Sequence, residues 1–137
     1  MRKKIKPVLK DDILEKHYET LHFVTKTKQL FLMPKLTLMD LSDEAGISVD
    51  VVKKILNEKM HVTFFEFISG YKINKAKQLL TNTREGQFSI SDIAAQSGFN
   101  TNDSFSIIFK QHTNISPEEF RIKFYKILPD SSVSNGD

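Results

Sequence analysis

The sequence contains no cysteine and no tryptophan, and only five glycines and four prolines among its 137 residues. Without cysteine the chain can form neither disulfides nor thiolate metal sites, which agrees with a reducing cytoplasm. No apolar run approaches the roughly 20 residues that a membrane-spanning helix needs. The basic N-terminal residues are not followed by an apolar stretch, so we expect no signal peptide.

The sequence also lacks the usual signatures of an enzyme or a metal site. Its four histidines are scattered, and there is no HExxH pair, no phosphate-cradling glycine loop and no recognisable nucleophile setting. His17 and His22 lie five residues apart and therefore do not share a helix face. We therefore expect no catalytic activity, no cofactor and no bound metal.

The composition is that of a soluble globular protein, with 39% hydrophobic and 27% charged residues. The net charge of +3 is compatible with a nucleic-acid partner but does not establish one. Apolar residues recur three and four positions apart, and strand-like alternation is nearly absent. The pattern predicts an all-α fold with about seven helices.

The expected order begins with a basic segment and a first helix within 1–30, the helix starting near residue 12. A domain at 31–125 follows, with helical hairpins at about 37–60 and 89–113, a long linker helix at about 63–81 between them, and a closing helix at about 116–127. The polar tail at 128–137 is expected to be disordered.

Four helix starts carry the spacing of a capping box, in which a hydroxyl stands three residues before a carboxylate. The pairs are Thr37 with Asp40, Thr63 with Glu66, Ser89 with Asp92, and Ser116 with Glu119. Each pair falls at a boundary that the hydrophobic periodicity predicts independently. Pro117 occupies a first helical position, where its missing N–H costs little.

An internal repeat organises the chain. The segment around Leu38, Leu41 and Gly46 matches the segment 52 positions later, and after one inserted residue the match continues at an offset of 53. Each copy predicts a short capped helix, a glycine turn, a second helix and the start of a third. This is the arrangement of a helix-turn-helix unit.

In each copy, the apolar side of the second helix packs on the first helix, and the opposite side carries polar groups and cations that suit base edges and phosphates in a major groove. We call these second helices the reading helices. The candidate DNA-contacting residues are Asp50, Lys53, Lys54 and Asn57 in the first copy, and Thr101, Asn102, Asp103, Ser104, Ser106, Ile107 and Lys110 in the second.

Several stretches resemble the AraC/XylS family of transcription regulators, over about residues 31–124. The stretches are 71–80, similar to the end of the family's linker helix; 89–99, similar to its Ile-Ala…Gly-Phe segment; and 104–112 with 116–121, similar to its closing signature. The resemblance implies a DNA-binding domain with two helix-turn-helix units, whose reading helices enter successive major grooves of double-stranded DNA.

The chain departs from the family pattern at a few positions. His61 and Asn114 stand where the family usually has glycine after each reading helix, and both residue types tolerate left-handed backbone. Ile107 replaces a common arginine, and Asn57 stands where a cation is common.

The family usually adds a sensor or dimerisation domain, for which residues 1–30 are too short. We therefore expect the chain to be the output part of a longer bacterial regulator, in the cytoplasm or at the cytoplasmic end of a membrane-anchored protein. RNA polymerase is a further candidate partner. The alternative is a helical protein-docking module that does not bind DNA, in which exposed Ile107 anchors a protein partner.

Overall fold

The structure, a computed structural model, describes the backbone of residues 2–83 and 87–125, and side chains from residue 12 onward. Over these ranges the chain is all-helical, with seven α-helices and no strand, as the sequence predicts. The predicted tail at 128–137 and the end of the predicted closing helix lie outside the described residues. The chain divides into two compact units, Met1–Ile68 and Ser69–Asp137, and one continuous helix, α4, joins them.

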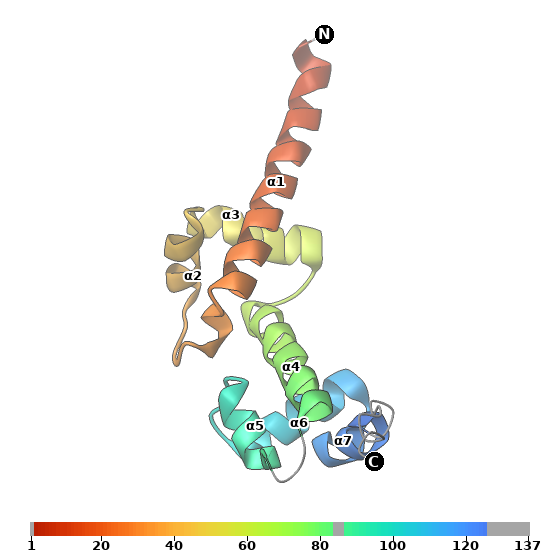
Figure 1. Ribbon diagram of the computed structural model, residues 1–137. Coiled ribbons are helices and arrows are strands. Elements are labelled where there is room, and N and C mark those ends of the chain that lie inside the picture. Colours follow the sequence, from red (N-terminus) through yellow and green to blue (C-terminus); the bar gives the residue numbers. More distant parts are fainter. Residues whose placement is uncertain (1, 84–86, 126–137) are drawn as a thin grey trace. The chain divides into compact units, whose positions relative to one another are not determined.

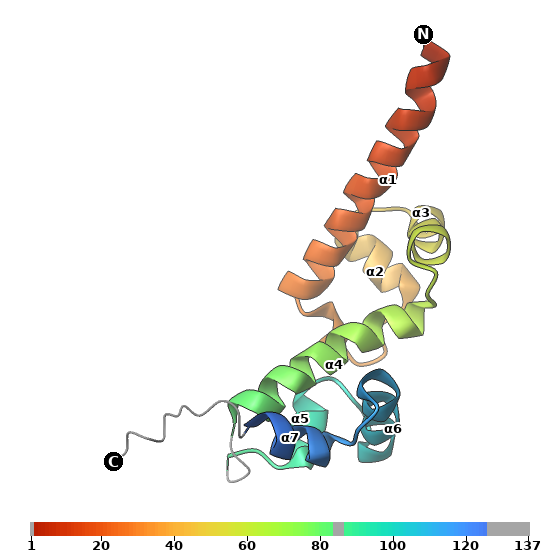
Figure 2. The same cartoon turned by 90° about the vertical axis from the view of Figure 1, so that its right-hand side faces the viewer.

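The first unit contains three helices and the start of a fourth. They are α1 (Arg2–Thr27), α2 (Leu38–Ala45), α3 (Val49–Lys54) and the first residues of α4 (Phe64–Asn82). A 3-10 turn at Leu30–Leu32 precedes α2, and α3 continues into a π-helical turn at Ile55–Met60. Helix α1 packs against α2 and against the π-helical turn that follows α3, and Figures 1 and 2 both show α1 beside α2.

Helix α1 differs from its predicted range, because it begins at Arg2 instead of near residue 12 and ends at Thr27 instead of residue 30. The early segment has no apolar periodicity, but its arginine and lysines are good helix formers, so it can extend a helix that later residues anchor. The helix ends because Gln29 takes a left-handed backbone with φ 49°, after which the 3-10 turn begins.

The core of the first unit is formed by one face of each helix. In α1, Leu21 and Thr25 are fully buried, and the Thr25 hydroxyl donates to the Leu21 carbonyl at 2.7 Å. The other buried hydrophobic side chains are Leu30, Phe31, Leu41, Ile47, Val52, Ile55, Leu56, Phe67 and Ile68. Leu41, Val52, Ile55 and Leu56 are the positions that the helical periodicity assigns to the interior.

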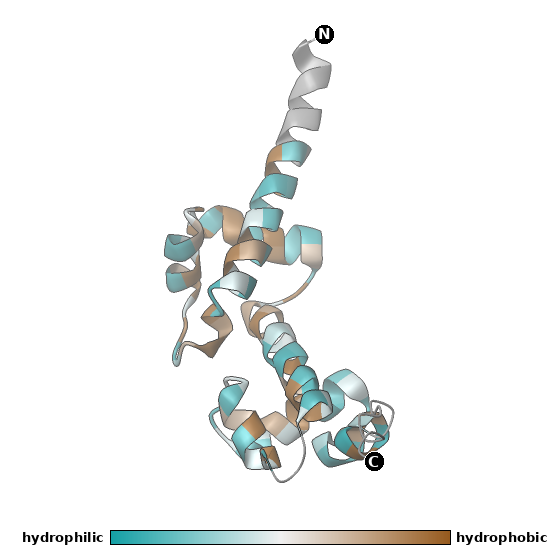
Figure 3. Ribbon diagram, viewed as in Figure 1, coloured by the Kyte–Doolittle hydropathy of each residue, from teal (hydrophilic) through white to brown (hydrophobic). Residues whose placement is uncertain are grey.

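The second unit gathers α5 (Ile90–Gln96), α6 (Asn102–Thr113) and α7 (Pro117–Tyr125) around the C-terminal part of α4 (Figures 1 and 2). In this part of α4, hydrophobic and hydrophilic residues alternate around the helix (Figure 3), and its apolar side faces the core. The buried cluster comprises Ile73, Ala76, Leu80, Ile93, Ala94, Phe99, Phe105 and Phe109.

All four predicted capping boxes are confirmed. At each start, the hydroxyl accepts the backbone N–H of the acidic residue, and the carboxylate accepts the backbone N–H of the hydroxyl residue, at distances of 2.9–3.0 Å. They fix where α2, α4, α5 and α7 begin, by satisfying N–H groups that the first helical turn leaves unpaired.

Candidate nucleic-acid interface

The first candidate reading helix extends from Val49 to Met60 and is positioned by caps at both ends. Ser48 precedes it, and its hydroxyl accepts the Val51 N–H at 3.3 Å. His61 ends it with a left-handed backbone, φ 57°. The inner side of the helix is held in the core by Val52, Ile55 and Leu56, which are at most 3% exposed.

Four predicted contact residues of this helix share its exposed side: Asp50, Lys53, Lys54 and Asn57. Lys53 and Lys54 stand near the middle of the helix, immediately before its π-helical turn. Asp50 stands in the first turn, where the positive end of the helix dipole favours a carboxylate. Asn57 lies within the π-helical turn, so the width of that turn sets its position on the exposed side.

The second candidate reading helix, α6, has the same length between its caps. Thr101 caps its start by accepting the Ser104 N–H at 3.0 Å, and Asn114 ends it with φ 71°. Phe105 and Phe109 are fully buried and stack edge-on with centroids 5.5 Å apart. These two rings anchor the inner side of the helix as Val52 and Leu56 do in the first unit.

The outer side of α6 contains the remaining predicted contact residues, with unequal exposure. Thr101, Asn102, Asp103, Ile107 and Lys110 are exposed, whereas Ser104 and Ser106 are only half-buried. The hydroxyls of Thr101 and Ser104 lie 3.1 Å apart and share the cap, so part of their bonding capacity is spent within the helix start. Ile107 is 59% exposed, which is high for a large apolar side chain.

Each unit turns between its two short helices at a glycine, as the sequence predicts. Gly46 has φ 68° and Gly98 has φ 96°, values that side chains other than glycine adopt rarely. At Gly46 an added Cβ would meet no atom within 4 Å, so backbone conformation and not crowding makes glycine favourable there. The second turn contains the one extra residue that the repeat offset indicates.

Sequence reasoning missed two cations that lie close to the reading helices. Lys59 lies in the π-helical turn, where its amine pairs with the Glu15 carboxylate and stands 5.1 Å from the Tyr18 ring centroid. Lys72 on α4 places its amine 5.5 Å from the centroid of Phe99, in the turn before α6, and partial burial lowers its pKa. Lys72 lies in the linker stretch that carries the resemblance. Neither lysine's contacts could be predicted from spacing, because the partners of both lysines are distant in the sequence.

No described helix is long and apolar enough to cross a membrane. Among the described side chains, those of residues 12–83 and 87–125, no group of three or more histidine or acidic residues could hold a metal ion.

Comparison with known proteins gives a consistent set of similarities. A family model described as a helix-turn-helix domain matches residues 41–123. An uncharacterized HTH-type transcriptional regulator of Staphylococcus aureus strain COL is 36% identical over 93 residues, which are 68% of this chain and 12% of that protein. The HTH-type transcriptional activator RhaR of Mannheimia succiniciproducens is 25% identical over 109 residues, covering 75% of this chain and 38% of the activator.

A solved structure shows the same fold. The DNA-binding domain of AdpA, a global transcriptional factor crystallised in complex with a target DNA, superposes with a TM-score of 0.65. The match has 15% sequence identity and covers 82% of this chain and 96% of that domain. The chain therefore spans nearly the whole of that DNA-binding domain, but only 12% of the length of the Staphylococcus relative.

Proposed function

Because this chain belongs to the AraC-type helix-turn-helix family of DNA-binding transcription regulators, we propose that it binds double-stranded DNA at specific sequences through its two reading helices. The observation that carries the proposal is the paired construction of these helices. Each has a hydroxyl cap, an apolar inner side in the core, an exposed polar outer side and a left-handed C-cap.

The exposed outer sides supply the two kinds of group that DNA recognition needs. Lysine amines neutralise phosphates and provide affinity, whereas short polar groups contact base edges and provide sequence preference. Lys53, Lys54 and Lys110 are of the first kind, and Asn57 and Asn102 are of the second. We propose all eleven predicted contact residues as the interface, with the half-buried Ser104 and Ser106 making fewer contacts than the others.

We further propose that the two reading helices occupy successive major grooves. The 19 residues of α4 give a helix roughly 28 Å long at about 1.5 Å per residue. Successive major grooves on one face of the duplex lie about 34 Å apart. The length of the joining helix therefore suits one reading helix in each groove.

The chain is proposed to be the output part of a longer bacterial regulator that acts in the cytoplasm. The Staphylococcus relative is roughly eight times longer than the matched segment, which leaves room for sensing or dimerisation elsewhere in such a protein. RNA polymerase is a candidate partner once DNA is bound. Attachment to a membrane through another part of the protein is compatible with the same arrangement.

One observation favours a second candidate function, a docking module for another protein. Ile107 is exposed at the centre of the outer side of α6, where an apolar anchor would suit a protein surface. On DNA the same side chain would contact a thymine methyl group. The two functions differ in salt dependence, since counterion release weakens DNA binding steeply as salt rises.

The decisive experiment is selection of bound duplexes from a random DNA library, followed by a salt series on the enriched site. We expect a defined site, with log affinity falling linearly with log salt at a slope near −0.9 for each phosphate contact. Replacing Lys53 and Lys54 by glutamine should flatten that slope, whereas replacing Lys16 and Lys26, exposed lysines of α1, should not. No enrichment of any sequence, with no salt-dependent binding, would exclude the proposal.

A further inference from the structure

The two reading helices end differently, although their caps lie at equivalent positions. In α6, the Asn114 N–H donates to the Lys110 carbonyl four residues back, at 2.7 Å, which is the α-helical pattern. In the first unit, the His61 N–H donates to the Leu56 carbonyl five residues back, and the Val62 N–H donates to the same carbonyl at 2.9 Å. The last turn of the first reading helix is therefore one residue wider.

A contact with α1 lies at this wider turn. Lys59 pairs with Glu15, and its amine stands 5.1 Å from the centroid of the Tyr18 ring. Glu15 and Tyr18 are three residues apart and therefore lie on one face of α1. We call Glu15, Tyr18 and Lys59 the α1 anchor. It joins the helix that begins the first unit to the end of its reading helix.

The width of the turn matters for the outer side of the reading helix. Asn57, a proposed base-contacting residue, lies inside the π-helical turn, whereas Lys53 and Lys54 precede it. One extra residue in a turn changes the angular position of the residues within it relative to those before it. π-Helical turns are rare, and they occur mostly as single turns within α-helices, frequently at functional sites.

We propose that Glu15 and Tyr18 are positioning residues for DNA recognition, acting through Lys59 to hold the π-helical turn that places Asn57. The inference rests on the proposed DNA-binding function. It gives α1 a role beyond packing: a change in α1 reaches the first reading helix through one ion pair and one cation–π contact. Both contacts are partly exposed to solvent and therefore weak, so their loss should reduce the base preference without abolishing DNA binding.

The test compares base preferences across variants, using the site that the parent chain selects from a random duplex library. Asn57→Ala first identifies the base pairs whose preference depends on Asn57. Glu15→Gln and Lys59→Met should relax preference at those same base pairs by about three- to tenfold, the range that one exposed ion pair with one cation–π contact permits. The double variant should lose no more than Lys59→Met alone, because Lys59→Met already removes the ion pair with Glu15 together with the cation–π contact with Tyr18.

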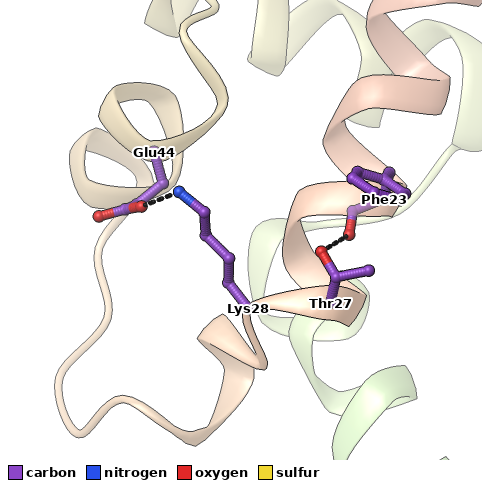
Figure 4. Close-up of polar contacts among 4 residues, drawn as sticks. All are labelled: Phe23, Thr27, Lys28 and Glu44. Atoms are coloured by element: carbon purple, nitrogen blue, oxygen red, sulfur yellow. Dashed lines mark hydrogen bonds and ion pairs between the residues drawn. The ribbon is translucent and has the colours of Figure 1, made fainter.

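The chain offers a matched control in the same unit. Lys28 and Glu44 form an exposed ion pair at 3.0 Å that joins the end of α1 to α2 and does not involve the reading helix (Figure 4). Glu44→Gln should therefore leave the preference unchanged. Tyr18→Phe, which retains the aromatic ring, should behave like the parent, whereas Tyr18→Leu should behave like Glu15→Gln.

Two readouts separate the possible outcomes. Backbone amide chemical shifts of His61 and Val62 should change in unbound Lys59→Met if the π-helical turn depends on the anchor. Unaltered shifts together with unaltered preference in Glu15→Gln and Lys59→Met would overturn the inference, as would a loss of preference equally large in Glu44→Gln. If the parent chain selects no duplex at all, the proposed function itself fails, and the amide shifts still decide whether the anchor holds the turn.

Discussion

His61 and Asn114 stand 53 positions apart and adopt the same left-handed backbone, with φ of 57° and 71°, each at the residue that ends a reading helix. The inserted residue in the second turn accounts for the offset, since the N-caps Ser48 and Thr101 are also 53 apart. His61 and Asn114 each have a Cβ, and the left-handed backbone is therefore less favourable for them than it would be for glycine. The prediction from the sequence that these two residues are left-handed is confirmed.

Replacing His61 or Asn114 by glycine is therefore expected to stabilise the chain by something on the order of 0.5–1 kcal/mol. Relief of the Cβ strain favours the folded state, and the greater chain entropy of glycine when unfolded offsets part of the gain. Urea unfolding midpoints measure the effect. Gln111→Gly, at an exposed position inside α6, should do the opposite and lower the midpoint. Lower midpoints in both cap variants would contradict the strain argument.

Much of this architecture was predictable because its signals are local. Capping boxes, glycine turns and the buried faces of α2 and α3 depend on residues three or four apart, and the repeat shows which of them occur twice. The family membership of the chain agrees with the resemblance that the motifs of its second half indicate.

Two of the features that sequence reasoning missed, the π-helical turn and the burial of Arg121, involve distant contacts. The π-helical turn at Ile55–Met60 is accompanied by a contact between Lys59 and α1, about 40 positions away in the chain. The early start of α1 was missed because residues before 12 show no apolar periodicity. Arg121 appeared only as part of the closing signature, yet it is 4% exposed.

Arg121 is expected to hold the segments on either side of residues 84–86 against α7. Its guanidinium donates to the Phe88 carbonyl at 2.8 Å and to the Thr83 hydroxyl at 3.3 Å. Arg121→Met retains much of the apolar bulk but leaves these acceptors without their donor, at a cost of about 1–3 kcal/mol in the free energy of unfolding. Lys123→Met, on the exposed side of the same helix, should change it by less than about 0.5 kcal/mol. Equal effects of the two variants would show that these bonds contribute nothing measurable.

The capping box of α7 predicts a specific acid dependence. The pKa of Glu119 is lowered chiefly because its carboxylate accepts the backbone N–H of Ser116, with a contribution from the Ser116 hydroxyl and from the charge of Lys110. A carboxylate whose pKa is lower in the folded than in the unfolded state stabilises the fold above its unfolded pKa, about 4.3 for glutamate. That stabilisation is lost as the pH falls through the lowered value.

Unfolding free energies of the parent and Glu119→Gln should therefore converge as the pH falls through this range. Carboxyl carbon chemical shifts, followed through a titration, report the pKa of Glu119 directly. Ser116→Ala should raise that pKa part of the way toward its ordinary value, because the backbone donor remains. A Glu119 titration midpoint at the ordinary value in the parent chain would contradict the role of the capping box.

The two reading helices are expected to divide the work of binding. The outer side of the first presents Lys53 and Lys54 side by side, whereas the outer side of α6 has one cation, Lys110, among short polar groups and exposed Ile107. Cations supply most of the salt-dependent affinity, and short polar and apolar groups discriminate between bases. We therefore predict that the first unit contributes more of the salt dependence and the second more of the sequence preference.

Two double variants test this division on the selected site. Lys53→Gln with Lys54→Gln should flatten the salt slope by up to about two units while retaining much of the preference among sites. Asn102→Ala with Ile107→Ala should leave the salt slope unchanged and reduce the preference among DNA sites, because these side chains are proposed to contact base edges and a thymine methyl group. Both pairs replace exposed side chains, so each variant should unfold at the parent's urea midpoint within a small margin. An equal fall of the salt slope in both pairs would mean that the two reading helices share affinity and preference alike.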